Sequence, residues 1–385
     1  MVQKETSESM LYINFNQDAS CFAVGTETGF RIYNTNPYKG TFIRDLNGGI
    51  GIIEMLYRSN ILALVGGGKC PKFAPNKVVI WDDHQGKVLS EMRFTNNVKN
   101  VKLKRDKIFV VCENKIYVFN FRNFELIESF ETFSNSKGLI SISTNNSNCV
   151  LAFPNKENRG QVFVKNYDNK TEVNINAHKN NLICIQLNSN GNLLATASEK
   201  GTLIRIFNTK TKDLIKEFRR GSENAEIFSI SFERNGKFLA VSSEKNTIHI
   251  FILNVNKEIN NININNINNN LNNNNLNNND NDNEDNLNNN NNNNINNVNL
   301  NNTNNHKNFL GKISGLFGIN NAYLNSEYSF SQFKINELRK ICAFGPDNSI
   351  FIISDEGKYY QAQYDPNNEK EFKKVREKNI YEETE

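Results

Sequence analysis

The stretch that decides the fold runs from residue 182 to residue 218. It contains four short runs of strand-forming residues: Leu182-Ile183-Cys184-Ile185-Gln186-Leu187, Leu193-Leu194-Ala195-Thr196-Ala197-Ser198, Thr202-Leu203-Ile204-Arg205-Ile206-Phe207-Asn208 and Asp213-Leu214-Ile215-Lys216-Glu217-Phe218. Each run is rich in β-branched, aromatic and other apolar residues, and polar residues typical of turns separate the runs. Four short antiparallel strands within about 40 residues are typical of one blade of a β-propeller.

The third run of this unit recurs along the chain as a small turn, alternating β-branched and aromatic residues, and then Asn or Asp. The spacing between copies is roughly 38 to 48 residues, with one gap of about twice that length, and a weaker copy fills the gap. The strong copies lie at Gly29–Asn34, Lys77–Asp82, Lys115–Asn120, Thr202–Asn208 and Thr247–Phe251, and the weaker copy lies at Gly160–Asn166. The sequence therefore predicts an all-β fold built from repeated blades.

Counting these units predicts a seven-bladed β-propeller with degenerate WD40-type repeats. The Trp-Asp dipeptide occurs once, at Trp81-Asp82, so the strand period carries the prediction. We expect the blades at 9–46, 50–94, 98–133, 138–178, 181–221, 226–253 completed by 328–335, and 338–366. The propeller would thus comprise 9–253 and 328–366, and the charged residues 367–385 would form a frayed tail.

Residues 254–327 interrupt the sixth blade and consist largely of asparagine. Such a segment cannot bury a core, so we expect a long disordered loop between the third and fourth strands of that blade. Loop closure costs little more as a loop lengthens, so an expansion is tolerated at an exposed loop tip.

The end of this insertion, residues 309–319, is apolar. If it formed a short helix, one side would carry Phe309, Ile313, Leu316 and Phe317, and Leu310 adds to the apolar surface. An apolar segment on a disordered tether suits shallow insertion into a bilayer interface. The alternatives are that it packs against the propeller or is an inert remnant.

Composition excludes several classes of protein. The formal net charge of the 385 residues is only +4, which does not indicate a generally basic surface for nucleic acid. The six cysteines are scattered and several lie in apolar runs, so we expect buried free thiols in a reducing compartment. The start of the chain lacks an apolar signal-peptide core, and there is no run of about 18 apolar residues. The sequence predicts a cytoplasmic protein that at most lies on a membrane.

The tetrapeptide Phe218-Arg219-Arg220-Gly221 ends the outer strand of the fifth predicted blade, and we expect the glycine to reverse the chain. Successive strand residues point to opposite sides, so the two arginines should face two different places. A guanidinium is a planar fork that suits a phosphate. The pair is therefore either solvated on an outer strand or serves two anion pockets.

Blades five and six carry matching polar residues near this pair. In blade five, Ser198 begins a Ser-Glu-Lys turn and is followed by Thr202 and Arg205. In blade six, Ser243 begins the same turn and is followed by Thr247 and His249. Hydroxyl, imidazole and guanidinium groups donate hydrogen bonds to the phosphate oxygens of a phosphorylated polyol, and Ser and Thr hydroxyls also accept them from its ring hydroxyls. Alternatively, His249 could be a core residue, and His178 could be a structural histidine between blades. The repeated arrangement favours two anion pockets.

The chain outside the asparagine tract resembles the PROPPINs, a family of β-propellers that bind polyphosphoinositides and act in autophagy and endolysosomal traffic. Phe-Arg-Arg-Gly at 218–221 is the family's motif. The segments 60–68, 71–73, 79–83 and 200–205 are also similar to the family. The region from the triple glycine to Trp81-Asp82-Asp83 looks most like the branch that partners the autophagy lipid-transfer protein.

The resemblance implies two headgroup sites that use the two arginines separately, and a membrane-inserting loop in blade six. Site one would consist of His178, Ser198, Thr202, Arg205 and Arg219. Site two would consist of Arg220, Ser243, Thr247 and His249.

The resulting hypothesis is a phosphoinositide-binding peripheral membrane effector, monomeric in solution, that reads phosphatidylinositol 3-phosphate and/or phosphatidylinositol 3,5-bisphosphate. It would recruit the autophagy lipid-transfer protein or conjugation machinery through blades two and three, at preautophagosomal or endosomal and lysosomal membranes. We expect no cofactor, no metal and no enzymatic activity, because no nucleophile–base pairing appears and Gly66-Gly67-Gly68 lacks the Lys-Ser/Thr of a P-loop. The alternative is a WD-type scaffold that binds only proteins, with the arginines contacting an acidic peptide.

Overall fold

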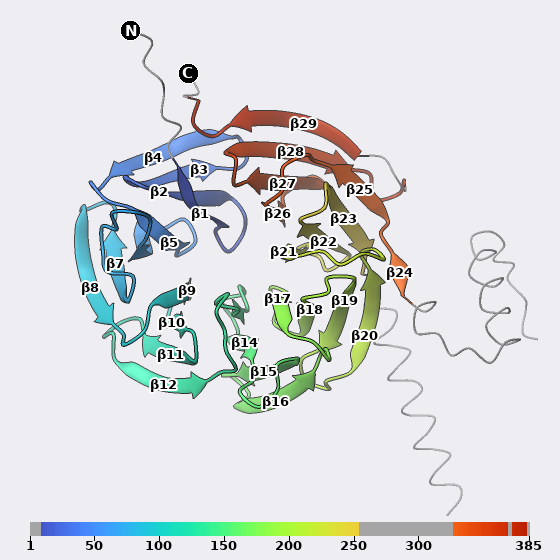
Figure 1. Ribbon diagram of the computed structural model, residues 1–385, viewed down its shortest axis with the longest axis horizontal. Coiled ribbons are helices and arrows are strands. Elements are labelled where there is room, and N and C mark those ends of the chain that lie inside the picture. Colours follow the sequence, from blue (N-terminus) through green and yellow to red (C-terminus); the bar gives the residue numbers. More distant parts are fainter. Residues whose placement is uncertain (1–8, 254–325, 369–371, 383–385) are drawn as a thin grey trace, which may run out of the picture. The chain divides into compact units, whose positions relative to one another are not determined.

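The computed structural model describes residues 9–253, 326–368 and 372–382. The strands form seven sheets around a central axis, as Figure 1 shows, and all strand pairs within them are antiparallel except β20 (Leu214–Arg219) with β24 (Glu327–Tyr328). The predicted seven-bladed all-β propeller is confirmed. In this described part of the chain, no helix is long and apolar enough to cross a membrane.

The first four blades follow each other along the chain, each with its first strand nearest the axis (Figure 1). Blade one contains β1 (Met10–Phe15), β2 (Cys21–Thr26), β3 (Gly29–Asn34) and β4 (Lys39–Asp45). Blade two contains β5 (Ile50–Met55), β6 (Ile61–Gly66), β7 (Lys77–Asp82) and β8 (Lys87–Arg93). Blade three contains β9 (Val98–Leu103), β10 (Lys107–Cys112), β11 (Lys115–Asn120) and β12 (Leu126–Glu131). Blade four contains β13 (Ser141–Ile142), β14 (Val150–Pro154), β15 (Gln161–Asn166) and β16 (Thr171–Asn176).

The last three blades carry the interruption and the end of the chain. Blade five contains β17 (Leu182–Leu187), β18 (Leu193–Ser198), β19 (Leu203–Asn208) and β20 (Leu214–Arg219), with β24 (Glu327–Tyr328) added at its edge. Blade six contains β21 (Ile227–Phe232), β22 (Phe238–Ser243), β23 (Thr247–Ile252) and β25 (Ser331–Lys334). Blade seven contains β26 (Lys340–Phe344), β27 (Ser349–Ser354), β28 (Lys358–Tyr364) and β29 (Phe372–Asn379).

The position of a strand within its blade sets its burial. Second strands such as β18 and β22 are buried along their whole length, because neighbouring blades cover both of their faces. Outer strands such as β4 and β12 are largely exposed. The outer strand β20 differs at its end, where Phe218 and Arg219 are both buried. The arginine motif therefore lies in the propeller edge and not on a solvated strand.

The hydrophobic core is a series of layers between neighbouring blades. One layer joins β6 and β7 of blade two to β9 and β10 of blade three, and includes Val65, Ile80 and Val101. Equivalent layers join blades one and two, three and four, four and five, and six and seven. A strand such as β6 contributes to two layers, because its successive side chains point to opposite faces of the blade.

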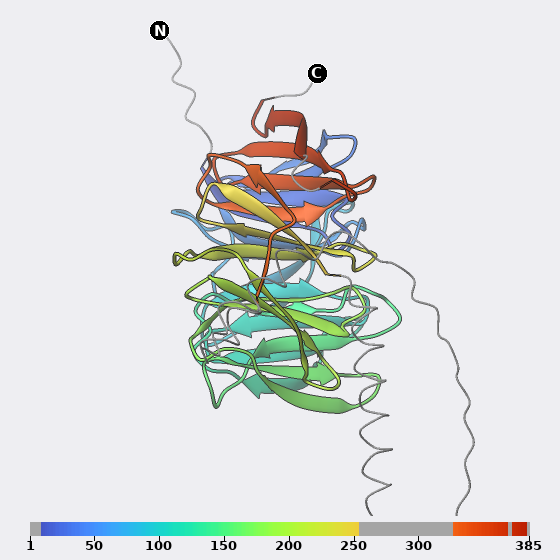
Figure 2. The same cartoon turned by 90° about the vertical axis from the view of Figure 1, so that its right-hand side faces the viewer.

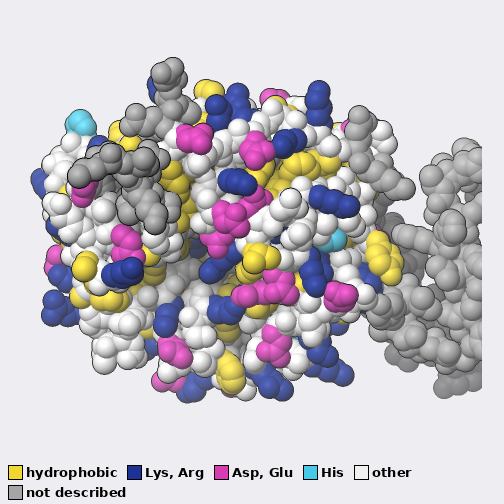
Figure 3. Space-filling view, turned by 45° about the horizontal axis from the view of Figure 1, so that its top comes forward, with side chains coloured by type: hydrophobic (Ala, Val, Ile, Leu, Met, Phe, Trp, Pro, Cys, Tyr) yellow, Lys and Arg dark blue, Asp and Glu magenta, His cyan; other side chains and the backbone are white. Residues whose placement is uncertain are grey.

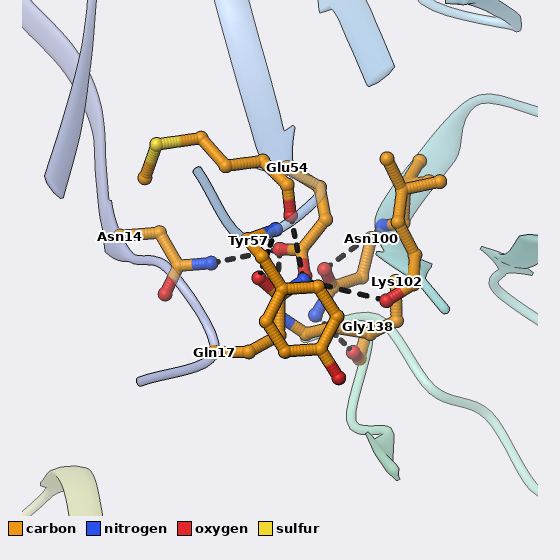
Figure 4. Close-up of polar contacts among 10 residues, drawn as sticks. Asn14, Gln17, Glu54, Tyr57, Asn100, Lys102 and Gly138 are labelled. Carbon is orange, nitrogen blue, oxygen red and sulfur yellow. Dashed lines mark hydrogen bonds and ion pairs between the residues drawn. The ribbon is translucent and has the colours of Figure 1, made fainter. Parts of the chain in front are cut away.

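A buried polar cluster lies among the inner strands of blades one to three. Glu54 of β5 is 4% exposed and pairs with Lys102 of β9, with 2.9 Å between Oε2 and Nζ. Asn14 of β1 donates to the same carboxylate at 3.0 Å, as Figure 4 shows. Burial raises the pKa of Glu54, although the neighbouring ammonium group opposes this. The cluster joins three blades. Because the Glu54 carboxylate and the Lys102 ammonium group are paired with each other, we interpret the cluster as structural and not catalytic.

The ring closes through aromatic packing between blades one and seven. Tyr359 of β28 stacks on Phe22 and Tyr38, with ring centroids 5.9 and 4.7 Å apart. The Tyr359 hydroxyl donates to the Thr35 carbonyl at 2.7 Å, and the Tyr33 hydroxyl donates to the Ile380 carbonyl at 2.8 Å. The last blade is therefore joined to the first by side chains, and each contributes its own four strands.

The prediction that residues 367–385 form a frayed tail is wrong in its central part. Residues Phe372–Asn379 form β29, which pairs antiparallel with β28 and completes blade seven. Six of its eight residues are exposed, so its sequence is mostly charged and lacks the apolar alternation that predicts a strand. Its backbone ladder, supported by Phe372 stacking on Phe333 at 4.9 Å, provides the order that the sequence did not indicate.

The fourth strand of blade six was predicted at 328–335, and the structure divides this segment between two blades. β24 pairs parallel with β20, so that Phe218 lies opposite Glu327 and Arg219 opposite Tyr328. The Lys216 ammonium lies 3.3 Å from the Glu327 carboxylate and adds to this contact. β25 then pairs antiparallel with β23. Figure 2 looks at the edge of the propeller that carries these strands.

The cysteine prediction is confirmed for most positions. All six thiols are free, and Cys21, Cys112, Cys149 and Cys342 are buried. Cys184 is partly buried, whereas Cys70 is exposed, which corrects the expectation of buried thiols at that position.

Candidate functional site

Phe218 anchors the arginine motif between blades five and six. Its side chain is fully buried and stacks on Phe251 of β23, with ring centroids 4.8 Å apart. Because side chains alternate along β20, Arg220 follows Phe218 toward blade six. Arg219 shares the opposite face with Glu217, which pairs with Arg205 of blade five. The two arginines thus lie on opposite sides of the strand.

Arg220 is held by backbone groups at the end of blade five. Its Nε donates to the Gly201 carbonyl at 2.9 Å, and its Nη2 donates to the Glu223 carbonyl. Its own backbone N–H donates to the Thr202 carbonyl at 2.9 Å. The side chain is 7% exposed, and this burial lowers the guanidinium pKa, while nearby Glu244 and Glu223 oppose the effect. An arginine remains charged under such a shift, so a cation is fixed at the junction of blades five and six.

His249 lies next to this cation and is hydrogen-bonded at both ring nitrogens. Its Nε2 lies 3.0 Å from the Thr247 hydroxyl, and its Nδ1 lies 3.3 Å from the Ser329 hydroxyl. Burial and then the charge of Arg220 lower the pKa of the imidazole to about 4. The ring is therefore neutral at pH 7. The structure brings Arg220, Thr247 and His249 together, as predicted for site two.

Ser243 is the most deeply placed residue predicted for site two. It is fully buried at the end of β22, and its hydroxyl accepts the Lys245 backbone N–H at 3.3 Å. The same turn leads to Thr247, whose N–H donates to the Lys245 carbonyl at 2.8 Å. Ser243 thus shapes the turn that carries Thr247.

His178 and Arg205, predicted for site one, lie close together on the other side. The Arg205 Nε lies 2.8 Å from the Glu217 carboxylate, and Nη1 donates to the Ala177 carbonyl at 2.7 Å. His178 Nε2 lies 3.0 Å from the hydroxyl of Thr196. Burial and then the charge of Arg205 lower the pKa of His178 to about 4. Both side chains therefore have partners within the protein. For His178, this agrees with the alternative of a structural histidine between blades.

Ser198 and Thr202, also predicted for site one, begin and end a turn that contacts Arg220. The Ser198 carbonyl accepts the Gly201 N–H at 2.7 Å. The last two carbonyls of the turn, those of Gly201 and Thr202, both accept hydrogen bonds from Arg220. Arg219 is 5% exposed and lies opposite Leu203 in the ladder of β19 and β20. The turn predicted for one site thus also orients the arginine of the other.

Two glycines near the arginines have different roles. Gly201 has φ +59°, and a Cβ there would lie 1.7 Å from the Ala225 carbonyl oxygen, so no other residue fits. Gly221 lies outside the left-handed region, and a Cβ there would contact nothing within 4 Å. The chain bends at residues 222 and 223, so the expected reversal at Gly221 does not depend on glycine.

Sequence reasoning missed Thr196, Glu217 and Ser329. Thr196 and Glu217 lie on strands of blade five, where their alternation with apolar residues reads as ordinary strand pattern. Ser329 follows the insertion and reaches His249 only because the segment 327–334 changes partner from β20 to β23. The predicted insertion residues Phe309, Leu310, Ile313, Leu316 and Phe317 lie outside the described residues.

Other kinds of site find little support in the described part of the chain. It contains no group of three or more His, Cys, Asp or Glu residues that could hold a metal ion. On the face that Figure 3 shows, Lys and Arg side chains are interspersed with Asp and Glu side chains. This face therefore carries mixed charge and not a basic patch.

Comparison with known proteins places this chain in a family. The PROPPIN family model matches residues 9–264. Autophagy-related protein 18 of Dictyostelium discoideum is 36% identical over 246 residues, which are 64% of this chain and 65% of that protein. Autophagy-related protein 18e of Arabidopsis thaliana is 42% identical over 247 residues, 63% of this chain and 66% of that protein. The chain thus spans just under two thirds of the length of these relatives.

Solved structures share the fold. Hsv2 of Kluyveromyces lactis matches with a TM-score of 0.69 at 24% identity, over 97% of this chain and 100% of that chain. KlAtg21, solved in complex with the coiled coil of AgAtg16, matches with a TM-score of 0.69 at 22% identity, over 97% of this chain and 99% of that chain. Since the family model covers well over half of the sequence, the chain belongs to the PROPPIN family.

Proposed function

We propose that this PROPPIN is a peripheral membrane effector that binds phosphatidylinositol 3-phosphate and/or phosphatidylinositol 3,5-bisphosphate and recruits autophagy machinery to the membrane. Members of the family are non-enzymatic β-propellers that function in autophagy. The observation that carries the proposal is the placement of Arg219 and Arg220 on opposite sides of one strand end. Each side has its own hydroxyl and imidazole groups.

The geometry of Arg220 suits an anion. Two of the five N–H donors of its guanidinium are used by the carbonyls of Gly201 and Glu223, which fix its orientation. A phosphate meets a cation already in place, so little side-chain entropy is lost on binding. The neutral ring of His249 adds a hydrogen-bonding group that a phosphate or an inositol hydroxyl can use.

Two sites on one rigid edge suit reversible attachment. A charge-assisted hydrogen bond contributes about 1.5 to 3 kcal/mol, so one headgroup site binds modestly. Two sites on the same membrane increase the apparent affinity by roughly 10²- to 10⁴-fold. Insertion of residues 309–319 would add apolar burial. Loss of the phosphate from the lipid would then release the protein.

Recruitment of other proteins is the second part of the proposal. The related fold of KlAtg21 was solved with the coiled coil of AgAtg16, which supports a partner from the autophagy machinery. We propose the lipid-transfer protein or the conjugation machinery as the partner, bound through blades two and three. The site of action would be preautophagosomal or endosomal and lysosomal membranes.

Vesicle flotation tests the lipid part. The protein should float with vesicles that contain phosphatidylinositol 3-phosphate or the 3,5-bisphosphate, and not with vesicles that contain only phosphatidylinositol. Changing Arg219 and Arg220 together to Thr should abolish flotation while the circular dichroism spectrum stays unchanged.

A matched control removes two other positive charges. Lys210 lies in the exposed turn between β19 and β20, and Arg234 in the exposed turn between β21 and β22. In an antiparallel meander these turns lie at the opposite end of the blades from Arg219 and Arg220. The variant Lys210→Thr/Arg234→Thr should float like the unchanged protein. No flotation of the unchanged protein would instead favour a scaffold that binds only proteins.

A further inference from the structure

We propose that Lys340 of blade seven is a positioning residue for site two, because its buried ammonium group fixes the turn that presents Ser243 and Thr247. Site two is then assembled from three blades: five supplies Arg220, six supplies the turn and His249, and seven supplies the cation beneath the turn. This inference rests on the proposed headgroup binding at site two.

Lys340 is the first residue of β26 and has no exposed surface. Its Nζ donates to the Ser243 carbonyl at 3.1 Å and to the Lys245 carbonyl at 2.9 Å. It also donates to the carbonyl of Glu337 at 2.7 Å, and the carbonyl of Leu338 at 3.3 Å shares one of its three N–H donors. The ammonium group thus joins the turn between β22 and β23 to the chain that enters blade seven.

These contacts continue to the candidate site without a break. The Lys245 carbonyl, held by Lys340, also accepts the N–H of Thr247. The Thr247 hydroxyl lies 3.0 Å from Nε2 of His249. Removing the ammonium group leaves two turn carbonyls without this donor, so the turn should shift and carry Thr247 with it.

The salt bridges near this turn do not hold it in place of Lys340. Lys245 itself reaches out of the turn to the Glu223 carboxylate, but both side chains are well exposed and such a pair holds weakly. Glu337 is paired with Lys358 and accepts from the Tyr360 hydroxyl at 2.5 Å. The Lys340 ammonium is therefore bound by carbonyl dipoles, and its charge is not cancelled by a direct ion pair with these carboxylates.

A second buried lysine offers a matched control. Lys104 is 4% exposed, and its Nζ donates to the carbonyls of Ser143 at 2.9 Å and Asn145 at 2.7 Å. It therefore links blade three to a turn of blade four as Lys340 links blade seven to a turn of blade six. It lies between blades three and four, away from site two. Its substitution therefore shows how much headgroup binding falls when a buried lysine between two blades is lost.

The experiment is a calorimetric titration with a soluble short-chain phosphatidylinositol 3-phosphate. The unchanged protein should bind two headgroups, and Lys104→Met should also bind two. Lys340→Met should bind one, with affinity at the other site lowered at least tenfold, and should match Arg220→Thr. The double variant Lys340→Met/Arg220→Thr should lose nothing more, because both changes act on the same site.

Two headgroups bound by Lys340→Met with unchanged affinity would overturn the proposal, and so would equal losses in Lys340→Met and Lys104→Met. Absence of headgroup binding by the unchanged protein would defeat the proposed function itself and the inference with it. If Lys340→Met lacks a cooperative thermal transition, Lys340→Gln is measured in its place, because its amide keeps two N–H donors. Retained binding at site two by that variant fits the positioning role, because its amide still donates to turn carbonyls, whereas equal losses at both headgroup sites would contradict it.

Discussion

Phe218 stacks on Phe251 with ring centroids 4.8 Å apart, and this contact joins the outer strand of blade five to the third strand of blade six. Both rings are fully buried. The arginine motif is therefore positioned by its phenylalanine as much as by the strand ladder. We expect Phe218→Ala to lower the free energy of unfolding by about 3 to 5 kcal/mol, because it leaves a cavity between the blades.

The control is Leu214→Ala on the same strand, where the side chain is 48% exposed. That change should alter the free energy of unfolding by no more than about 0.5 kcal/mol. Urea denaturation followed by tryptophan fluorescence measures both. Similar stability losses in the two variants would show that the ring stack does not hold β20 in place.

Single arginine variants test the division into two sites. Arg219→Thr and Arg220→Thr should each bind one soluble headgroup in place of two, because the side chains lie on opposite faces of β20. On vesicles each variant should lose roughly 10²-fold or more in apparent affinity, since avidity disappears with one site. Titration calorimetry and flotation measure these quantities. Complete loss of headgroup binding in either single variant would indicate one shared pocket.

Ser329 and Ser331 form a matched pair beside site two. The Ser329 hydroxyl lies 3.3 Å from Nδ1 of His249, whereas the buried Ser331 hydroxyl has no hydrogen-bond partner in the described part of the chain. Ser329→Ala should weaken headgroup binding at site two by about 2- to 10-fold, the value of one ordinary hydrogen bond. Ser331→Ala should leave binding unchanged. Calorimetry on an Arg219→Thr background isolates site two, and equal effects of the two changes would exclude a role for Ser329.

The two histidines predict how stability depends on pH. Both have a pKa of about 4 in the folded protein, against 6.5 for an ordinary histidine. Between these values the unfolded chain binds more protons, so stability is fully present above pH 6.5 and is lost as the pH falls toward 4. Each histidine contributes at most about 3 kcal/mol to this loss.

The variant His178→Gln/His249→Gln removes this dependence while carboxylates continue to titrate. Its unfolding midpoint should therefore fall less between pH 7.5 and pH 5 than the midpoint of the unchanged protein. Differential scanning calorimetry at several pH values measures the two slopes. Parallel slopes would mean that the two histidines have the same pKa in the folded and the unfolded protein.

Much of the fold could be predicted because it repeats. Buried second strands such as β18 read as apolar runs, and alternation along β19 and β20 places Arg205, Glu217 and Arg219 on one face. The same periodicity predicted that the two arginines face different places, and the structure finds His249 of blade six beside Arg220. Strand alternation is a local property, so a single sequence is sufficient for it.

Contacts between distant segments could not be predicted in this way. Ser329 reaches site two because the chain returns after the insertion and changes its strand partner. Lys340 reaches the turn beside it because blade seven packs against blade six, and no local pattern encodes either contact. Arg205 is a second example: its sequence position suggests a ligand, yet its partner Glu217 is set by the ladder register. Strand β29 was not predicted because most of its residues are exposed and charged, and its order comes from backbone pairing with β28.

Removal of that last strand gives the final prediction. A chain ended after residue 366 loses β29 and the Ile380 carbonyl that accepts the Tyr33 hydroxyl. It thereby leaves β28 as an open edge and exposes the aromatic layer that closes the ring between blades one and seven. We expect a marked fall in the thermal midpoint and a tendency to aggregate, whereas a chain ended after residue 382 should behave like the full chain. Size-exclusion chromatography and scanning calorimetry distinguish these outcomes, and unchanged stability of the shorter chain would mean that blade seven needs only three strands.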